Sequence, residues 1–79
     1  MEIEIRFWGG IAYYLPEVRG KSSVKKSVDP GTTIRELVDG MKLPKELSFF
    51  ITVNGRFIET QYALRDGDKV ALYPPISGG

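Results

Sequence analysis

An Asn-Gly pair between two β-rich runs is the feature that most restricts how this chain folds. Residues 49–53 and 56–58 are rich in β-branched and aromatic side chains, and Asn54-Gly55 separates them. Both central residues of a type I′ turn have positive φ, which Asn and Gly tolerate best, so this segment is predicted to be a two-residue hairpin. In the predicted register the paired residues are Ile51 with Ile58 and Thr52 with Phe57.

Three other segments have the two-residue period of β-strands. Residues 2–8 place Ile3, Ile5 and Phe7 on one face, and residues 69–73 turn Val70 and Leu72 inward. Residues 22–28 are more polar and are predicted to form an edge strand, where lysines discourage pairing with another chain. A docking patch is the alternative to a solvated edge for the basic residues there, Arg19, Lys21, Lys25 and Lys26.

One helix is predicted between the two pairs of strands. Thr33 followed by Glu36 matches a capping box, and Pro44 discourages continuation of the helix. The apolar residues that follow the cap recur at i, i+3, i+4 and i+7, which gives one buried stripe. The stripe consists of Ile34, Leu37, Val38 and Met41.

The order of these elements predicts an α+β fold. Two strand pairs flank one main helix, so the helix can cover one face of a mixed sheet with the first and last strands parallel in its middle; this is the β-grasp. Residues 1–73 are assigned to the domain, with a helical turn considered for residues 11–15. The predicted core is Ile3, Ile5, Phe7, Ile34, Leu37, Val38, Ile51, Val53, Leu64, Val70 and Leu72.

The composition excludes several classes of function. The 79 residues include no Cys and no His, which removes the commonest nucleophile, metal ligand and neutral-pH base. A net charge of +1 indicates neither nucleic acid nor an anionic membrane as partner. Without cysteines a secreted disulfide scaffold is not expected, and the cytoplasm is the expected location. For Asp66 and Asp68, turn chemistry is favoured over a metal site, because no third ligand accompanies them.

The last residues are predicted to be a flexible tail over residues 74–79. Pro74 and Pro75 cannot continue a hydrogen-bonded strand, so the last strand ends near Tyr73. Six extended residues reach roughly 20 Å, and the terminal Gly78-Gly79 can thread a channel too narrow for side chains. A frayed terminus or an expression scar is the alternative.

Four aromatic residues lie on the wrong face of their predicted strands. They are Trp8, Phe50, Phe57 and Tyr73. If the first and last strands are parallel neighbours, Trp8 and Tyr73 approach each other near the start of the tail. Clustered exposed aromatics mark interfaces, so these residues are predicted to help form a partner-docking patch. The alternative is a second small cluster covered by residues 9–16.

The chain resembles the ubiquitin-like sulfur carriers of the MoaD/ThiS family over essentially its whole length. The resemblance is carried by Val53-Asn54-Gly55, by Leu64-x-Asp66-Gly67-Asp68-x-Val70 and by Tyr73-Pro74-Pro75-Ile76-Ser77-Gly78-Gly79. The Pro-Pro pair is more similar to the small subunit of molybdopterin synthase than to the thiamine-pathway carrier.

This resemblance implies a function for the tail. An E1-like enzyme would use ATP and magnesium to convert the Gly79 carboxylate into an acyl-adenylate, and a sulfur donor protein would then leave a Gly79 thiocarboxylate. The tail, residues Pro74, Pro75, Ile76, Ser77 and Gly78, would insert into the large subunit of molybdopterin synthase, where sulfur passes to cyclic pyranopterin monophosphate. The catalytic acids and bases would belong to the partners, and the chain itself would bind no metal or cofactor.

Other functions stay open. A thiamine-pathway sulfur carrier would use the same terminal chemistry. A protein modifier would join Gly79 to lysines as an isopeptide. A plain interaction module would have an incidental tail.

Overall fold

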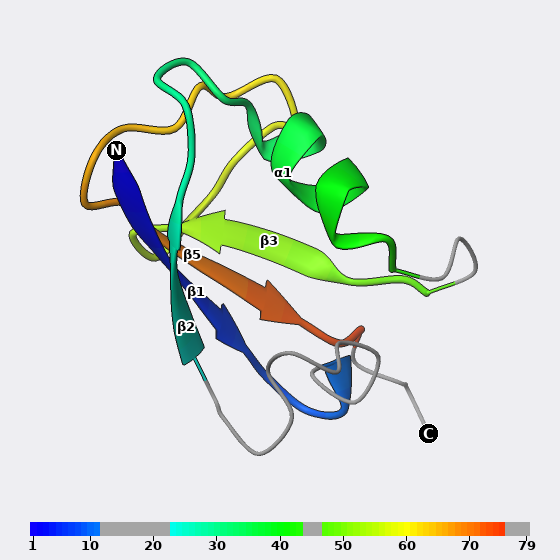
Figure 1. The fold of residues 1–79 in the computed structure, drawn as a ribbon. Coiled ribbons are helices and arrows are strands. Elements are labelled where there is room, and N and C mark those ends of the chain that lie inside the picture. Colours follow the sequence, from blue (N-terminus) through cyan, green and yellow to red (C-terminus); the bar gives the residue numbers. More distant parts are fainter. Residues whose placement is uncertain (12–22, 44–46, 76–79) are drawn as a thin grey trace.

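The computed structural model describes residues 1–11, 23–43 and 47–75 of the chain (Figure 1). The elements, in chain order, are β1 (Glu2–Phe7), β2 (Ser23–Ser27), α1 (Ile34–Met41), β3 (Phe50–Val53), β4 (Arg56–Phe57) and β5 (Lys69–Tyr73). Their order and the single described helix confirm the predicted α+β fold. The helical turn considered after residue 11 lies outside the described residues.

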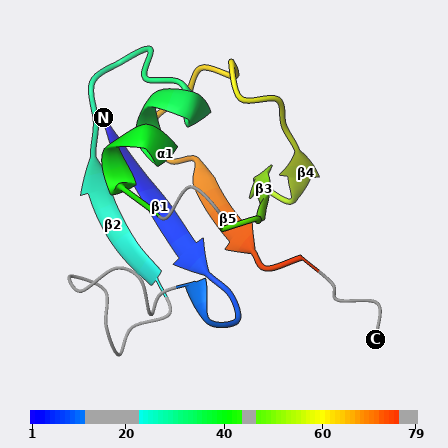
Figure 2. The same cartoon turned by 90° about the vertical axis from the view of Figure 1, so that its right-hand side faces the viewer.

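The five strands form one mixed sheet in the order β2-β1-β5-β3-β4. β1 and β5 are parallel neighbours near the middle, with Ile5 opposite Val70 and Phe7 opposite Leu72. The other strand pairs are antiparallel, and β2 lies at one edge, as predicted. Because β1 and β5 run in the same direction, the end of β5 lies at the opposite end of the sheet from the N-terminus (Figure 2).

The hairpin turn between β3 and β4 is of the predicted kind. Asn54 and Gly55 both have positive φ, at 53° and 83°, as a type I′ turn requires. The predicted pairing of Thr52 with Phe57 is confirmed. The predicted pairing of Ile51 with Ile58 is wrong, since β4 ends at Phe57.

The chain leaves the sheet after Phe57 because its next residues bind the start of the helix. The carbonyl of Thr60 accepts a hydrogen bond from the Arg35 amide at 2.9 Å, and that of Tyr62 accepts one from Ile34 at 3.0 Å. These amides belong to the first turn, where no intrahelical partner exists. Ile58 is half-buried and still packs against the core.

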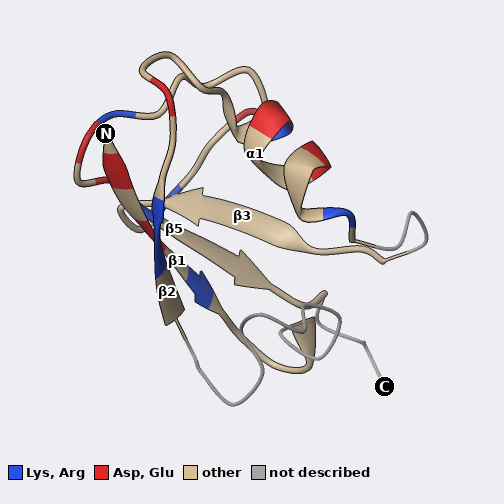
Figure 3. Ribbon diagram, in the orientation of Figure 1, with Lys and Arg blue, Asp and Glu red and all other residues tan. Residues whose placement is uncertain are grey.

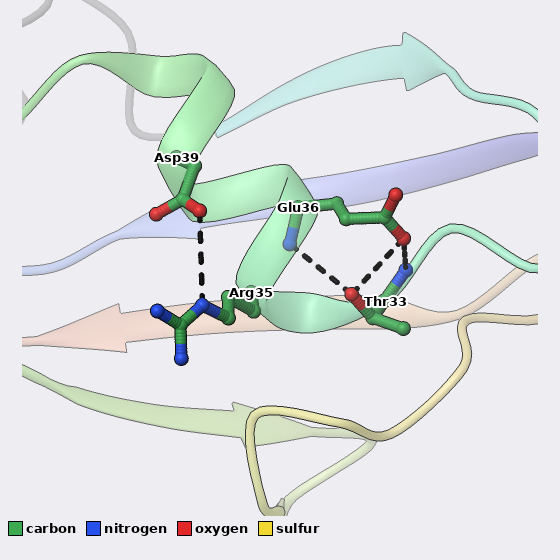
Figure 4. A network of polar contacts seen from close by, with 4 residues as sticks. All are labelled: Thr33, Arg35, Glu36 and Asp39. Atoms are coloured by element: carbon green, nitrogen blue, oxygen red, sulfur yellow. Dashed lines mark hydrogen bonds and ion pairs between the residues drawn. The ribbon is translucent and has the colours of Figure 1, made fainter.

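The capping box at the start of α1 is present as predicted (Figure 4). The Glu36 amide donates to Thr33 Oγ1 at 3.2 Å, and the Thr33 amide donates to Glu36 Oε1 at 3.0 Å. The hydrogen bonds from Thr33 lower the pKa of the Glu36 carboxyl, because they favour its charged form. At the other end the left-handed residue is Lys42, with φ 57°, and Gly40 lies within the helix.

The core lies between α1 and the sheet face that α1 covers. The buried residues include nine of the eleven predicted ones, namely Ile3, Ile5, Phe7, Ile34, Leu37, Val53, Leu64, Val70 and Leu72. The other two, Val38 and Ile51, are only half-buried, because they line a depression of about 460 Å³ between α1 and β3. Met41 is buried, as predicted for the helix stripe, and Ile11 is buried although it was absent from the predicted core.

Charged residues lie mainly outside this core. β2 contains Lys25 and Lys26, whereas α1 carries the exposed acidic residues Glu36 and Asp39 together with Arg35 (Figure 3). Lys25 and Lys26 are solvent-exposed, which both a solvated edge and a docking patch require. Arg19 and Lys21, the other residues of the basic cluster, lie outside the described residues. No helix in the described part of the chain is long and apolar enough to cross a membrane.

Candidate functional site

The aromatic rings of Trp8 and Tyr73 stack where the ends of β1 and β5 meet. Trp8 directly follows β1, and its amide donates a hydrogen bond to the Leu72 carbonyl at 3.0 Å, which extends the contact with β5 by one residue. The ring centroids are 5.8 Å apart and the ring planes differ by 8°. The guanidinium carbon of Arg6 lies 5.9 Å from the Trp8 ring centroid. The predicted approach of Trp8 to Tyr73 is therefore confirmed.

The stack continues across the sheet as a band of four aromatic side chains. Tyr73 lies opposite Phe50 in the β3–β5 pairing. Phe50 contacts Phe57 edge to face, with ring centroids 6.3 Å apart. These four residues, which we call the aromatic band, come from four neighbouring strands or strand ends. Phe7 and Leu72, the chain neighbours of Trp8 and Tyr73, point into the core, and so does Val53, which is three residues from Phe50 in β3. Because side chains alternate between the two faces of a strand, the band lies on the sheet face that α1 does not cover.

The aromatic band is exposed to an unusual degree. Trp8 is 45%, Phe50 50% and Phe57 78% solvent-exposed, and Tyr73 is half-buried under its neighbours. The exposure of large apolar side chains to water is unfavourable. A contiguous group of such side chains is typical of a binding surface. The exposure is what a docking surface requires, and most of the segment that would cover the alternative second cluster, residues 9–16, lies outside the described residues.

A shallow groove of about 270 Å³ begins at the aromatic band. Trp8 and Tyr73 line it together with the small residue Ala71 and the charged residues Arg6 and Lys69. Apolar contact area bordered by charged groups is the usual composition of a protein interface. The groove extends the candidate docking surface from the band onto the polar part of the same sheet face.

The start of the C-terminal segment lies beside the aromatic band. Pro74 and Pro75 follow Tyr73 directly and are exposed. Of the tail residues singled out from the sequence, the structure places only these two, and Ile76, Ser77, Gly78 and Gly79 lie outside the described residues. Any partner bound to the aromatic band is therefore next to Pro74 and Pro75, the first residues of the tail.

Gly9 is a residue of this site that the sequence analysis missed. It has φ +61°, and a Cβ atom on it would lie 2.6 Å from Cγ of Pro74. From the sequence, Gly9-Gly10 only marked the end of an alternating strand. Two glycines directly after a strand are a signal of close backbone approach, but nothing in the sequence names Pro74 as the residue that approaches.

The carboxylate of Asp68 stabilises the turn before β5, as predicted, whereas that of Asp66 links the same loop to the start of β1. Asp66 Oδ1 accepts a hydrogen bond from the Glu2 amide at 2.7 Å. Asp68 is buried and accepts from Asn54 Nδ2, the Tyr62 hydroxyl and the Arg65 amide. The described residues contain no group of three or more potential metal ligands among His, Cys, Asp and Glu.

Comparison with known families and structures gives a consistent result. The sequence profile of a family described as Mut7-C ubiquitin matches residues 1–77. No curated protein matches the chain significantly.

Three solved structures illustrate the similarity. A putative molybdopterin converting factor subunit 1 from Pyrococcus furiosus superimposes with a TM-score of 0.78 at 21% identity, over 96% of this chain and 99% of that one. The small archaeal modifier protein 1 of H. volcanii gives 0.71 at 22% identity, over 95% and 98%. A complex of subunits 1 and 2 of the molybdopterin-converting factor from Helicobacter pylori gives 0.66 at 25% identity, over the full length of both chains. These matches confirm the β-grasp fold and the resemblance to the MoaD/ThiS group of ubiquitin-like proteins.

Proposed function

The chain belongs to the Mut7-C ubiquitin family, and we propose that it is a sulfur carrier whose Gly79 carboxylate is converted to a thiocarboxylate on partner enzymes. The observation that carries the proposal is the position of Tyr73, which belongs to the exposed aromatic band and is also the last residue before Pro74-Pro75. A partner docked on the band would therefore receive the tail directly.

The tail needs activation, because a carboxylate is a poor acylating agent. An E1-like adenylating enzyme would supply ATP and magnesium, and an oxygen of the Gly79 carboxylate would attack the α-phosphorus with release of pyrophosphate. Sulfur at the oxidation level of sulfide, supplied by a sulfur donor protein, would then attack the acyl carbon, displace AMP and leave the thiocarboxylate. The chain has no His or Cys, so the groups that move protons in these steps would be supplied by the partners.

The finer proposal is that this chain is the small subunit of a molybdopterin synthase. The H. pylori structure of the molybdopterin-converting factor pairs a chain of this fold with a second subunit. By analogy, the large subunit would bind the aromatic band and take up residues 74–79. One sulfur atom would pass from Gly79 to cyclic pyranopterin monophosphate in each of two cycles, which together form the dithiolene. The catalytic residues would lie on that subunit.

The intact mass of the protein isolated from cells tests the carrier function. We expect a fraction whose mass has risen by the replacement of one oxygen atom with sulfur. After activation in vitro with an E1-like enzyme and a sulfur donor, we expect this fraction to release sulfide. Isopeptide adducts to lysines in place of the sulfur mass would instead identify a protein modifier, and a chain that no E1-like enzyme adenylates would be a plain interaction module.

The pathway is tested separately by supplying the thiocarboxylate form with each acceptor system. Dithiolene formation with a molybdopterin synthase large subunit and cyclic pyranopterin monophosphate is the expected result. Thiazole formation with the enzymes of thiamine synthesis, and none with the synthase, would assign the chain to the thiamine pathway.

A further inference from the structure

Gly9 and Pro74 fit together only because Gly9 has no side chain. A Cβ atom on Gly9 would lie 2.6 Å from Cγ and 3.2 Å from Cδ of Pro74. Carbon atoms in ordinary contact are about 3.5–4.0 Å apart. The Pro74 ring therefore occupies the space that a side chain on residue 9 would fill.

The Pro74 ring cannot move aside as a long side chain would. Its Cδ is bonded to the backbone nitrogen of the same residue, and the ring fixes φ near −65°. Relief of a 2.6 Å contact to about 3.5 Å requires residues 9 and 74 to move apart by about 1 Å. A change of ring pucker supplies only part of that shift, so the backbone at this contact has to move. A side chain on residue 9 would thus change the direction in which the chain leaves β5.

Three consecutive residues of the C-terminal segment are held by the end of β1. The Leu72 carbonyl accepts a hydrogen bond from the Trp8 amide, the Tyr73 ring stacks on Trp8, and the Pro74 ring lies on Gly9. The first two contacts fix the aromatic band itself. The third contact fixes the position of Pro74, the first residue of the tail, relative to the aromatic band.

We propose that Gly9 is a positioning residue, which sets the direction of the tail relative to the aromatic band. The inference rests on the proposed function, because the direction matters only if Gly79 is delivered to a partner held on that band. A positional error of about 1 Å in a reacting group costs on the order of 100-fold in rate. Substitution of Gly9 should therefore impair delivery of Gly79 rather than docking.

The test compares Gly9→Ala with the double variant Gly9→Ala/Pro74→Ala in ATP–pyrophosphate exchange by an E1-like enzyme. We expect Gly9→Ala to lower kcat by roughly 10- to 100-fold with KM within about twofold, because the band stays intact. Alanine at position 74 lacks Cγ and Cδ and keeps only Cβ, which lies at 3.5 Å. The double variant should therefore recover part of the lost rate, because the contact is relieved although the ring that fixes φ is lost.

Two glycines supply matched controls. A Cβ on Gly10 meets no atom within 4 Å, so Gly10→Ala adds the same methyl group next door without the contact. Gly31 has φ +87° and equally open space, so Gly31→Ala introduces left-handed strain alone. Both variants should exchange at the wild-type rate. A Gly9→Ala rate within twofold of wild type, or no rescue in the double variant, would overturn the inference.

An enzyme-free measurement separates this inference from the proposed function. In the wild-type protein, nuclear Overhauser contacts are expected between the Gly9 α-protons and the Pro74 ring, and they should weaken in Gly9→Ala. Their absence in the wild type overturns the inference. If the wild-type protein shows these contacts but supports no ATP–pyrophosphate exchange, the contact between Gly9 and Pro74 is confirmed. The proposed carrier function is then rejected.

Discussion

The carboxylate of Asp68 joins the Asn54-Gly55 turn to the loop before β5. Its Oδ1 accepts a hydrogen bond from Asn54 Nδ2 at 3.0 Å, and its Oδ2 accepts from the Arg65 amide at 2.8 Å and the Tyr62 hydroxyl at 3.2 Å. Asn54 in turn accepts a hydrogen bond from the Lys69 amide at 3.0 Å. The side chain of Asp68 is therefore a structural carboxylate, bound by three donors from two segments of the chain.

Substitution of Asp68 by alanine should destabilise the protein by at least about 1–3 kcal/mol, because the change leaves partly buried donors without an acceptor. The matched control is Asp66→Ala, which removes one exposed hydrogen bond to the Glu2 amide and should cost about 0.5–1.5 kcal/mol. Urea denaturation of both variants measures the difference. Equal losses for the two variants would contradict the assignment.

Stability should also depend on the ionisation of Tyr62 at alkaline pH. Partial burial, followed by the negative charge and hydrogen bond of Asp68, raises the pKa of the Tyr62 hydroxyl above its usual value near 10. The folded state thus favours the neutral phenol. The resulting stabilisation is fully present below pH 10 and is lost as the pH rises through the folded-state pKa. Thermal unfolding from pH 8 to pH 12 should show this loss, and Tyr62→Phe should remove that part of the pH dependence.

The sequence predicted those parts of the fold that depend on local chemistry. Thr33 and Glu36 form the expected capping box, and Asn54 and Gly55 form the expected turn, because each motif satisfies its own backbone within a few residues. The alternation in β1 and β5 placed their buried residues correctly. It also placed Trp8 and Tyr73 on the opposite face, where they form the predicted contact.

Three features that depend on distant segments could not be predicted from local patterns. Ile58 leaves the hairpin because the residues after it bind the start of α1, and that competition is not visible in a local pattern. Ile11 is buried although it follows two glycines and belongs to no periodic run. The contact of Gly9 with Pro74 joins residues 65 positions apart in the chain, and it arises only once β1 and β5 are parallel neighbours.

The aromatic band should bind partners without contributing much to the fold. Phe57 is 78% exposed, so Phe57→Ala should change the free energy of unfolding by no more than about 0.5 kcal/mol. Charge reversal beside the band, in Arg6→Glu, should likewise leave unfolding nearly unchanged. Both variants should weaken binding to the E1-like enzyme and to the synthase large subunit by about tenfold or more, or about 1.4 kcal/mol.

Lys26→Glu is the control for charge alone. Lys26 is exposed on the edge strand β2, opposite Ile3 in the pairing with β1, and lies outside the aromatic band. Calorimetric titration should give this variant the wild-type affinity. If Phe57→Ala and Arg6→Glu also bind both partners with unchanged affinity, the band is not the docking surface.

Deletion of Gly79 tests the tail without touching the fold. The deletion moves the terminal carboxylate back by roughly 3.5 Å, one residue of extended chain. Since about 1 Å of misplacement already costs on the order of 100-fold, both adenylation and sulfur transfer should collapse. The melting temperature should stay unchanged, because Leu72 is the last buried core residue in the described part of the chain. ATP–pyrophosphate exchange with the E1-like enzyme, followed by product formation with the synthase, measures the two steps.

Two substitutions near Gly79 test the effect of side-chain size in the tail while its length stays constant. Gly78→Val should be nearly as damaging as the deletion, since a β-branched side chain cannot pass a channel shaped for glycine. Ser77→Ala is the matched control and should have a mild effect, because it keeps the length of the chain and removes only a hydroxyl. Near-normal rates for the Gly79 deletion in both assays would reject the sulfur-carrier function, and the two glycines would then be an incidental end of the chain.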